Sequence, residues 1–214
     1  NAAAARQRFA REAHVTAELQ SPHTVQLYDF GITDAGSFYY VMERLRGIDL
    51  QRMVERHGPL PAERVVFLLK QACLSLSEAH ASMGYVQVFY DYDWAGAQKS
   101  FARAMELNPK YATAPQWNAW YLFAMGRFDE ALASMQRAQE LDPLSLIIND
   151  HLGYALFLAG KREEALAQLL RTRELDPAFP WVYWRLGSVY LALGRLDESI
   201  EAYRTVVRMT DGGV

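Results

Sequence analysis

Residues 29 to 31 read Asp29-Phe30-Gly31, and they are the first residues along the chain whose types and order suggest chemistry. In phosphoryl-transfer enzymes this tripeptide carries a magnesium-binding carboxylate. Such a reaction also needs a glycine-rich phosphate loop, a paired lysine, a catalytic base and a second metal ligand. The sequence supplies none of these around Asp29. We therefore predict no catalytic residue and interpret the tripeptide as the end of a strand followed by a turn.

The other potentially reactive side chains also lack partner residues at the spacing that a metal site or a catalytic site requires. The five histidines are scattered without the spacing of a metal site, so no metal and no other cofactor is predicted. Asp91 and Asp93 have no second ligand at usable spacing and are interpreted as turn residues. Cys73 is the only cysteine, which excludes a disulfide framework and favours a reducing, cytoplasmic setting.

Composition narrows the class of protein further. The chain has 214 residues, of which 51% are hydrophobic and 22% are charged, as expected for a folded globular protein. A net charge of -3 and a pI near 6.0 offer no basic field for nucleic acid or an anionic membrane. No apolar stretch reaches the roughly 20 residues that span a bilayer, so no membrane partner is expected. Because the chain begins at Asn1 rather than methionine, we expect a piece of a longer protein.

The strongest internal signal is a period of 34 residues in the second half of the chain. Three markers share this register, namely a proline, a glycine and a small residue: Pro109, Pro143 and Pro177; Gly126, Gly160 and Gly194; Ala131, Ala165 and Ser199. Periods of this length indicate stacked supersecondary units. Apolar residues recur at helical spacing between glycine and proline, so each unit is predicted to be a helix, a tight turn and a second helix.

These segments resemble the tetratricopeptide repeat, in particular HLGYALFLAGKREEAL and RLGSVYLALGRLDESI at residues 151–166 and 185–200. The earlier unit at residues 78–109 fits with one extra residue near the DYDW turn. The resemblance implies an array of about four helix pairs over residues 77–211. It also implies a groove, lined by the first helix of each pair, that binds a protein or peptide partner.

Residues facing that groove should recur at intervals of 34. One row is expected to contain an amide, a carboxylate and an indole, and the adjacent row lies four residues further along each helix. The expected groove residues are Gln116, Asp150 and Trp184, followed by Trp120, Tyr154 and Ser188. We expect the aromatic residues to provide affinity and the polar residues to fix the direction of an extended peptide. A core role for the same aromatics is the alternative.

Residues 6 to 80 resemble a second family, the bacterial serine/threonine protein kinases. The order of the kinase elements is kept along the chain. The C helix and fourth strand match residues 6–31, the fifth strand, hinge and D helix match residues 36–54, and the E helix matches residues 59–80. The resemblance places a partial kinase segment at residues 1–76. It implies remnant ATP-site positions at Glu12, Met42, Glu43 and Leu45. Since Asp29-Phe30-Gly31 precedes this hinge, it cannot be the kinase magnesium motif.

The kinase-like segment ends before its catalytic loop. Gln87, Val88 and Phe89 follow where a kinase would place its catalytic aspartate, so the chain as it stands is not expected to be an enzyme. The two families meet at residues 78–81, which suits either a natural loss of the kinase C-lobe or a join made during sequence assembly. Helix formers run from Ala62 to about Tyr90, so one helix is expected to cross this seam.

The fold class predicted from these patterns is mainly α, a superhelix of tetratricopeptide helix pairs with a small α+β remnant of a kinase N-lobe at the N-terminus. The leading function is a non-catalytic protein-interaction scaffold with a degenerate kinase fragment. The alternative is a fragment of a longer kinase, whose repeats act as a sensor or substrate-docking region and whose parent binds ATP and phosphorylates protein. A third possibility is a scaffold that self-associates through an exposed β edge.

Overall fold

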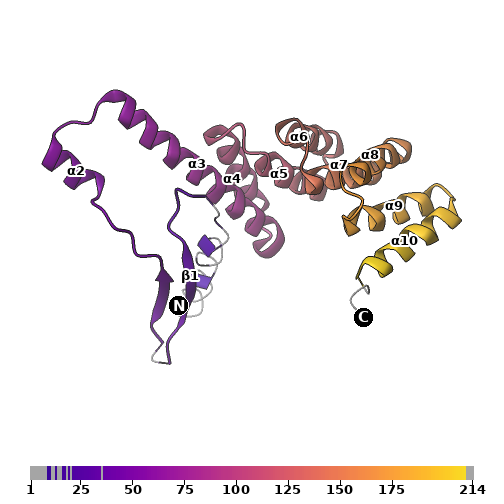
Figure 1. The fold of residues 1–214 in the computed structure, drawn as a ribbon, viewed down its shortest axis with the longest axis horizontal. Helices are drawn as coiled ribbons and strands as arrows, with labels where there is room; N and C mark the ends of the chain where they lie inside the picture. The colour runs from indigo at the N-terminus through magenta and orange to yellow at the C-terminus, as the bar shows by residue number, and fades with distance from the viewer. Residues whose placement is uncertain are drawn as a thin grey trace. The chain divides into compact units, whose positions relative to one another are not determined.

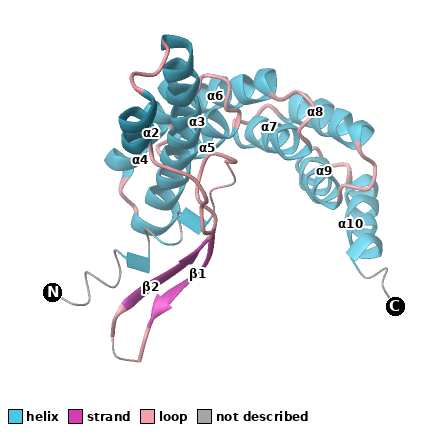
Figure 2. Ribbon diagram, turned by 60° about the vertical axis from the view of Figure 1, so that its left-hand side comes forward, coloured by secondary structure: helices cyan, strands magenta, loops and turns pink. Residues whose placement is uncertain are grey.

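The computed structural model describes residues 9, 10, 13, 16, 17, 19, 21–34 and 36–210. It contains two compact units, Asn1–Pro109 and Lys110–Val214. The described residues are mainly α-helical and include one two-stranded antiparallel sheet near the N-terminus (Figures 1 and 2). The predicted fold class, helix pairs with a small N-terminal sheet, is thus confirmed.

The sheet of the first unit is a hairpin of β1 (Leu27–Ile32) and β2 (Phe38–Met42). Phe30 lies opposite Tyr40 in the register, and all five residues of β2 are exposed. The Asp29 carboxylate accepts hydrogen bonds from the Phe30 N–H at 2.8 Å and the Tyr39 hydroxyl at 3.3 Å. Asp29-Phe30-Gly31 is therefore strand backbone, as predicted, but the turn expected at Gly31 begins only after Ile32, because Gly31 still pairs with Tyr39 in the sheet.

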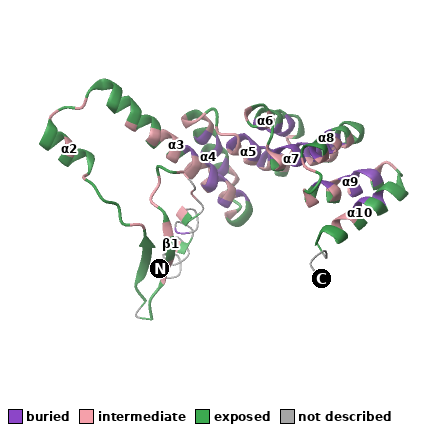
Figure 3. Cartoon of the chain, viewed as in Figure 1, coloured by how far each residue is buried: buried purple, intermediate pink, exposed green. Residues whose placement is uncertain are grey.

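Two helices follow the hairpin, α2 (Leu50–His57) and α3 (Ala62–Val86). Asp49 caps α2 by accepting a hydrogen bond from the Arg52 N–H at 2.8 Å. Every residue of α2 is at least partly exposed, and Figure 3 shows α2 mostly in the colour of exposed residues, whereas β1 alternates between exposed and intermediate. Helix α3 crosses the predicted seam without a break.

Helix α3 continues directly into η1 (Gln87–Asp91), a turn of π-helix, before α4 (Trp94–Leu107) begins. Tyr92 then adopts a left-handed conformation with φ 56°, and Asp93 caps α4 by accepting from the Gly96 N–H at 2.9 Å. A π-turn accommodates one residue more than an α-turn. This is the place where the sequence carries one extra residue, and its aspartates lie at the turn, as predicted.

Helices α3 and α4 form a close pair within the first unit. A Cβ added at Gly84 would lie 2.7 Å from the Phe101 ring, so only glycine permits this approach. The Ser77 hydroxyl donates to the Ala104 carbonyl at 2.8 Å. Glu78 also accepts a hydrogen bond from the Ser21 N–H at 2.7 Å, which connects α3 to the segment before β1.

The second unit consists of three helix pairs in sequence. They are α5 (Thr113–Ala124) with α6 (Phe128–Leu141), α7 (Leu146–Leu158) with α8 (Arg162–Leu175), and α9 (Pro180–Ala192) with α10 (Leu196–Thr210). Gly126, Gly160 and Gly194 have φ between 72° and 79° and turn the chain between the two helices of each pair. The residue after each glycine donates its N–H to a carbonyl five residues earlier, as in a Schellman motif.

The core of this unit lies between the first and second helices of each pair and between successive pairs. Ala131, Ala165 and Ser199, the small residues of the predicted register, are all buried. A Cβ at Gly153 would lie 2.5 Å from Leu169, which is itself fully buried. Small side chains at these positions let the helices approach and place larger apolar residues between them.

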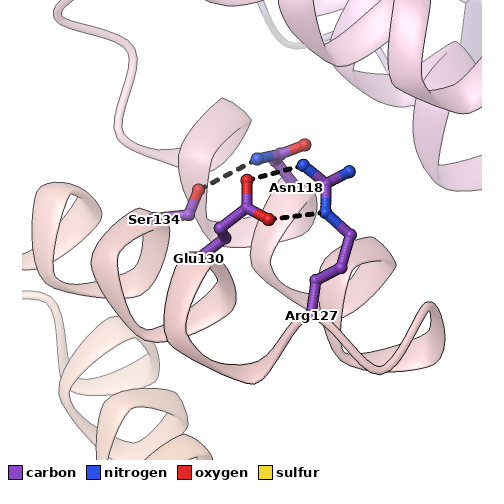
Figure 4. A network of polar contacts seen from close by, with 4 residues as sticks. All are labelled: Asn118, Arg127, Glu130 and Ser134. Atoms are coloured by element: carbon purple, nitrogen blue, oxygen red, sulfur yellow. Dashed lines mark hydrogen bonds and ion pairs between the residues drawn. The ribbon is translucent and has the colours of Figure 1, made fainter.

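Polar contacts fix the first pair at both its turn and its middle (Figure 4). The Arg127 guanidinium donates to both oxygens of Glu130, at 2.7 and 2.5 Å, and these hydrogen bonds lower the pKa of the Glu130 carboxyl. Asn118 of α5 donates to the Ser134 hydroxyl of α6 at 3.1 Å, and that hydroxyl donates to the Pro115 carbonyl at 2.8 Å. The arginine pair is exposed, so it orients the turn more than it stabilises the fold.

Candidate peptide-binding site

The first helices of the three pairs, α5, α7 and α9, contact one another through polar side chains. Gln116 Nε2 on α5 lies 2.8 Å from His151 Nδ1 on α7. Arg185 Nε on α9 lies 3.5 Å from Asp150 Oδ2 on α7. Both contacts join residues 35 apart, one more than the sequence period, so each polar side chain meets the residue that follows its equivalent in the next repeat.

Aromatic rings extend this contact surface. The Trp120 ring centroid lies 5.1 Å from that of His151 and 5.9 Å from that of Tyr154. The Arg185 guanidinium lies 3.8 Å above the Tyr154 ring, a cation–π geometry. A cluster of Trp120, His151, Tyr154 and Arg185 therefore links the three first helices, and we call it the aromatic–arginine cluster.

Burial shifts the pKa values of the two titratable neighbours on α7 in opposite directions. Loss of solvent raises the pKa of the Asp150 carboxyl to about 6, although Arg185 opposes that shift. The same loss of solvent, with the charge of Arg185, lowers the pKa of the His151 imidazole to about 4. At neutral pH His151 is thus uncharged and accepts at Nδ1 from the Gln116 amide.

One oxygen of Asp150 lacks a partner. Oδ2 faces Arg185, whereas Oδ1 is buried and accepts no hydrogen bond from any group in the described part of the chain. A cavity of about 300 Å³ adjoins this residue between α7 and α9. Its lining residues are Ile147, Asp150, His151, Phe179, Trp181 and Arg185. The site therefore combines a carboxylate, a guanidinium and apolar walls.

The predicted groove residues occupy different environments. Gln116 and Asp150 are buried, with 5% and 3% exposure, and make the contacts between helices described above. Trp184 is 49% exposed and its ring centroid lies 5.6 Å from that of Tyr203. The Ser188 hydroxyl is 3.0 Å from the Tyr203 hydroxyl, so Trp184 and Ser188 both contact α10.

The structure brings Trp120 and Tyr154 together, but it does not join Gln116, Asp150 and Trp184 into one row. Their assignment as groove residues stays a prediction. His151 and Arg185, which make the main contacts with this set, were missed by the sequence reasoning. For Arg185 the sequence did contain a signal, because an acidic residue at position 150 and a basic residue at position 185 lie on the first helices of successive repeats.

The remnant ATP-site positions of the first unit lie on β2 and the segment after it. Met42 and Leu45 are 51% and 67% exposed. The Glu43 carboxylate accepts from the Gln26 N–H at 2.9 Å, and the Glu43 N–H donates to the Gln26 carbonyl. Glu12 lies outside the described residues. An ATP-related role for these positions stays a prediction.

Two further properties concern cofactors and membranes. Among the described histidine, cysteine, aspartate and glutamate side chains, no group of three is placed to hold a metal ion. None of the helices in the described ranges is both long and apolar enough to cross a bilayer.

Helix pairs joined by glycine turns and repeated every 34 residues define a helical-repeat protein. The narrower class follows from family comparisons: a TPR repeat model matches residues 153–194, and two tetratricopeptide repeat models match residues 89–147 and 182–211. The chain therefore carries tetratricopeptide repeats, as the sequence period predicted.

Solved structures of repeat proteins share this arrangement. A thermophilic TPR protein of Thermus thermophilus aligns with a TM-score of 0.58 at 18% identity, over 71% of this chain and 88% of that protein. YrrB, a TPR protein with an unusual peptide-binding site, aligns with a TM-score of 0.54 at 18% identity, over 76% and 93% of the two chains. At these identities the likeness shows the fold alone.

The resemblance to bacterial kinases is also confirmed. Over 77 residues the chain is 42% identical to the serine/threonine-protein kinase PknE of Mycobacterium tuberculosis. That match covers 36% of this chain but only 13% of the kinase. The family boundary expected between residues 76 and 77 stays a prediction. The division of the chain into compact units after Pro109 is a separate property, because it reflects contacts and not family.

Proposed function

We propose that this chain is a protein-interaction module whose repeats bind an extended peptide segment of a partner protein. The observation that carries the proposal is the surface over α7 and α9, where a cavity is bordered by Trp181 with 62% exposure and adjoins the aromatic–arginine cluster. Exposed aromatic side chains beside buried polar groups are typical of binding hot spots. The peptide-binding site of YrrB, a TPR protein of similar fold, supports the same class of partner.

Binding is proposed to use the predicted groove residues, with Trp120 and Trp184 as anchors. Trp184 has half of its surface exposed, so its side chain is available to a partner. Gln116 is proposed to act from beneath by holding His151 in place, whereas Asp150 holds Arg185 and also lines the cavity. Apolar contact would then provide affinity, and the cavity would select one side chain of the peptide.

A displayed peptide library selected against the purified chain tests this function. We expect selected peptides to lose at least about tenfold in affinity on Trp184→Ala, while the melting temperature changes little because the indole is half exposed. Ile200→Ala, a change at an exposed apolar residue of α10, serves as the matched control and should leave binding intact. The function would be refuted if no peptide that binds the unmodified chain could be selected. It would also be refuted if the selected peptides bound the Trp120→Ala and Trp184→Ala variants as tightly as the unmodified chain.

We further propose that the kinase-like segment is degenerate and does not catalyse phosphoryl transfer in this chain. Support comes from the sequence, in which Gln87, Val88 and Phe89 stand where a kinase has its catalytic loop. It also comes from the position of these residues in η1, the π-helical turn that follows α3 and precedes α4. Incubation with labelled ATP and a generic protein substrate is expected to give no transfer above a buffer blank. Transfer above that blank would favour the alternative, a working kinase parent with ATP binding.

A scaffold that self-associates is the second candidate, and the exposure of all five β2 residues favours it. An unpaired strand edge can add a strand from another copy. Sedimentation of the chain against Val41→Lys tests this, because a charge on the edge strand should shift any dimer toward monomer. The cytoplasm remains the proposed location, on the basis of the lone free thiol of Cys73.

A further inference from the structure

The cavity between α7 and α9 presents opposite charges side by side on an apolar background. Asp150 and Arg185 line it together with Ile147, Phe179, Trp181 and the uncharged ring of His151. Its volume of about 300 Å³ lies at the lower end of the usual range for ligand pockets. The space therefore suits one side chain of a peptide better than a whole cofactor.

The charged pair is not internally satisfied. The Asp150–Arg185 contact of 3.5 Å is long for a charge-assisted hydrogen bond, which is typically about 2.7 to 2.9 Å. Oδ1 of Asp150 has no donor in the described part of the chain, although only 4% of this side chain is exposed. A buried acceptor without a donor costs roughly 1–3 kcal/mol. A ligand that brings a donor to Asp150 recovers that energy.

Arg185 supplies hydrogen-bond donors that complement the acceptor oxygens of Asp150. Its Nε faces Asp150 and its guanidinium plane lies on Tyr154, while 22% of the side chain remains exposed. An arginine has five N–H donors and no acceptor, so its terminal nitrogens suit an incoming oxygen. The χ2 torsion of aspartate is soft, so the carboxylate of Asp150 can adjust its orientation toward a donor that enters the cavity it lines.

Three kinds of side chain can be weighed against this pair. A lysine or arginine would meet the charge of Arg185, and a glutamate or aspartate would meet the charge of Asp150. A primary carboxamide donates from its nitrogen and accepts at its oxygen, so it pairs with both groups and buries no net charge. The methylene groups of a glutamine would then contact Ile147, Phe179 and Trp181.

We propose that this cavity binds the carboxamide side chain of a glutamine or asparagine in a partner peptide, with the amide N–H donated to Asp150 and the amide oxygen accepting from Arg185. This selectivity rests on the proposed peptide-binding function and names the side chain that the site selects. Burial that raises the pKa of Asp150 to about 6 supports it, because it reflects the removal of solvent from around the carboxylate.

Nuclear magnetic resonance titration of the labelled full chain with capped amino acids tests the proposal directly. The probes are the N-acetyl methylamides of glutamine, glutamate, lysine and methionine, which share one backbone and differ in the side-chain end group. We expect saturable shifts at the Trp181 indole and the Ile147 and Arg185 amides. The glutamine probe is expected to bind about tenfold more tightly than each of the others.

Two variants and a control localise the effect. Asp150→Asn keeps the shape and removes the carboxylate, and is expected to abolish the glutamine preference. Trp181→Ala removes an exposed wall and should weaken the glutamine probe without unfolding the chain. Val207→Ala, at an exposed residue of α10 away from the cavity lining, should bind as the unmodified chain does.

Each contrary outcome overturns the assignment. Tighter binding of the lysine probe would make the cavity a cation site, tighter binding of the glutamate probe an anion site, and equal binding of methionine a purely apolar one. Absence of saturable shifts with every probe, up to its solubility limit, would mean that the cavity selects no side chain. If library-selected peptides still depend on Trp184, the peptide-binding function stands while this selectivity fails.

Discussion

The hairpin with α2 and the tetratricopeptide repeats differ in how far their apolar side chains are buried. In β2 every residue is exposed, including Tyr40, Val41 and Met42, and α2 has no buried residue. Each repeat helix instead buries a stripe, as α6 does with Ala131, Leu132, Met135 and Ala138. The hairpin strands and the repeat helices both contain many apolar residues. Burial therefore depends on having a neighbour of matching period. Each repeat supplies a whole helix face, whereas the hairpin is contacted by single side chains such as Phe9, whose ring centroid lies 4.3 Å from that of Phe38.

Hydrogen exchange should give the largest difference between the two regions. Amides of α7 and α8 are expected to exchange at least about 100-fold more slowly than those of β1 and β2, because stacked repeats open only when several pairs separate. Exchange monitored by mass spectrometry over the whole chain measures both regions at once. Similar protection in the hairpin would break the comparison and point to a partner or a second copy covering it.

Truncation of one leucine in each region sharpens the comparison at the level of single side chains. Leu169→Ala removes a fully buried side chain that packs against Gly153 and should cost about 2–5 kcal/mol of unfolding free energy. Leu50→Ala, at a residue of α2 with 55% exposure, should cost less than about 0.5 kcal/mol. Urea denaturation of both variants gives the two values. Comparable costs would mean that the α2 surface is buried in solution.

The titration of α7 tests whether its buried polar groups belong to the core. Burial raises the pKa of Asp150 from 3.8 to about 6, so the native state holds the extra proton and stability falls as the pH rises through this window. Burial lowers the pKa of His151 from 6.5 to about 4, so the unfolded chain holds the extra proton and stability rises with pH over nearly the same window. The two contributions, each about 3 kcal/mol, nearly cancel.

Single substitutions should expose these opposed slopes. Asp150→Asn is expected to leave the His151 contribution, so the variant loses up to about 3 kcal/mol on acidification from neutral pH to about 4. His151→Gln should show the reverse and gain stability on acidification relative to the unmodified chain. Urea midpoints measured across this range decide the matter. Parallel pH profiles for all three proteins would show that neither group is buried in solution.

The smallest expected effect concerns backbone conformation at two glycines. Gly126 has φ 72° between α5 and α6, and Gly36 has φ 81° in the loop between β1 and β2. Alanine at Gly126 should lower the stability of the repeats by about 1 kcal/mol, since a side chain disfavours positive φ. Gly36→Ala carries the same strain but should leave the melting of the repeats unchanged. A drop for Gly36→Ala as large as for Gly126→Ala would couple the hairpin to the repeat core.

Much of the fold could be predicted because the same sequence markers recur in each repeat. Glycine, proline and small-residue markers at a period of 34 placed the turns, and Gly126, Gly160 and Gly194 are found there with positive φ. The kinase resemblance predicted one strand within residues 6–31 and the next within residues 36–54, and the strands are found at Leu27–Ile32 and Phe38–Met42. Helical spacing also predicted that α3 would cross the seam near Glu78.

The site was harder to predict, for a geometric reason. Equal spacing identifies equivalent residues, but contacts between successive repeats follow the stagger of their helices. Gln116 therefore meets His151 and not Asp150, and Asp150 meets Arg185 and not Trp184. A period in the sequence carries no measure of that stagger. Burial of Gln116 and Asp150 follows from the same offset, which places them between helices.

The π-turn at Gln87–Asp91 has a consequence for how the chain tolerates changes in length. One added residue in an α-helix rotates everything after it by about 100°, which would turn the apolar stripe of α4 away from α3. The wide turn absorbs that rotation before α4 starts, so Gly84 still faces Phe101 as Gly153 faces Leu169. The extra residue is thereby confined to a segment of five residues, and α4 keeps the rotation about its axis that its pairing with α3 requires.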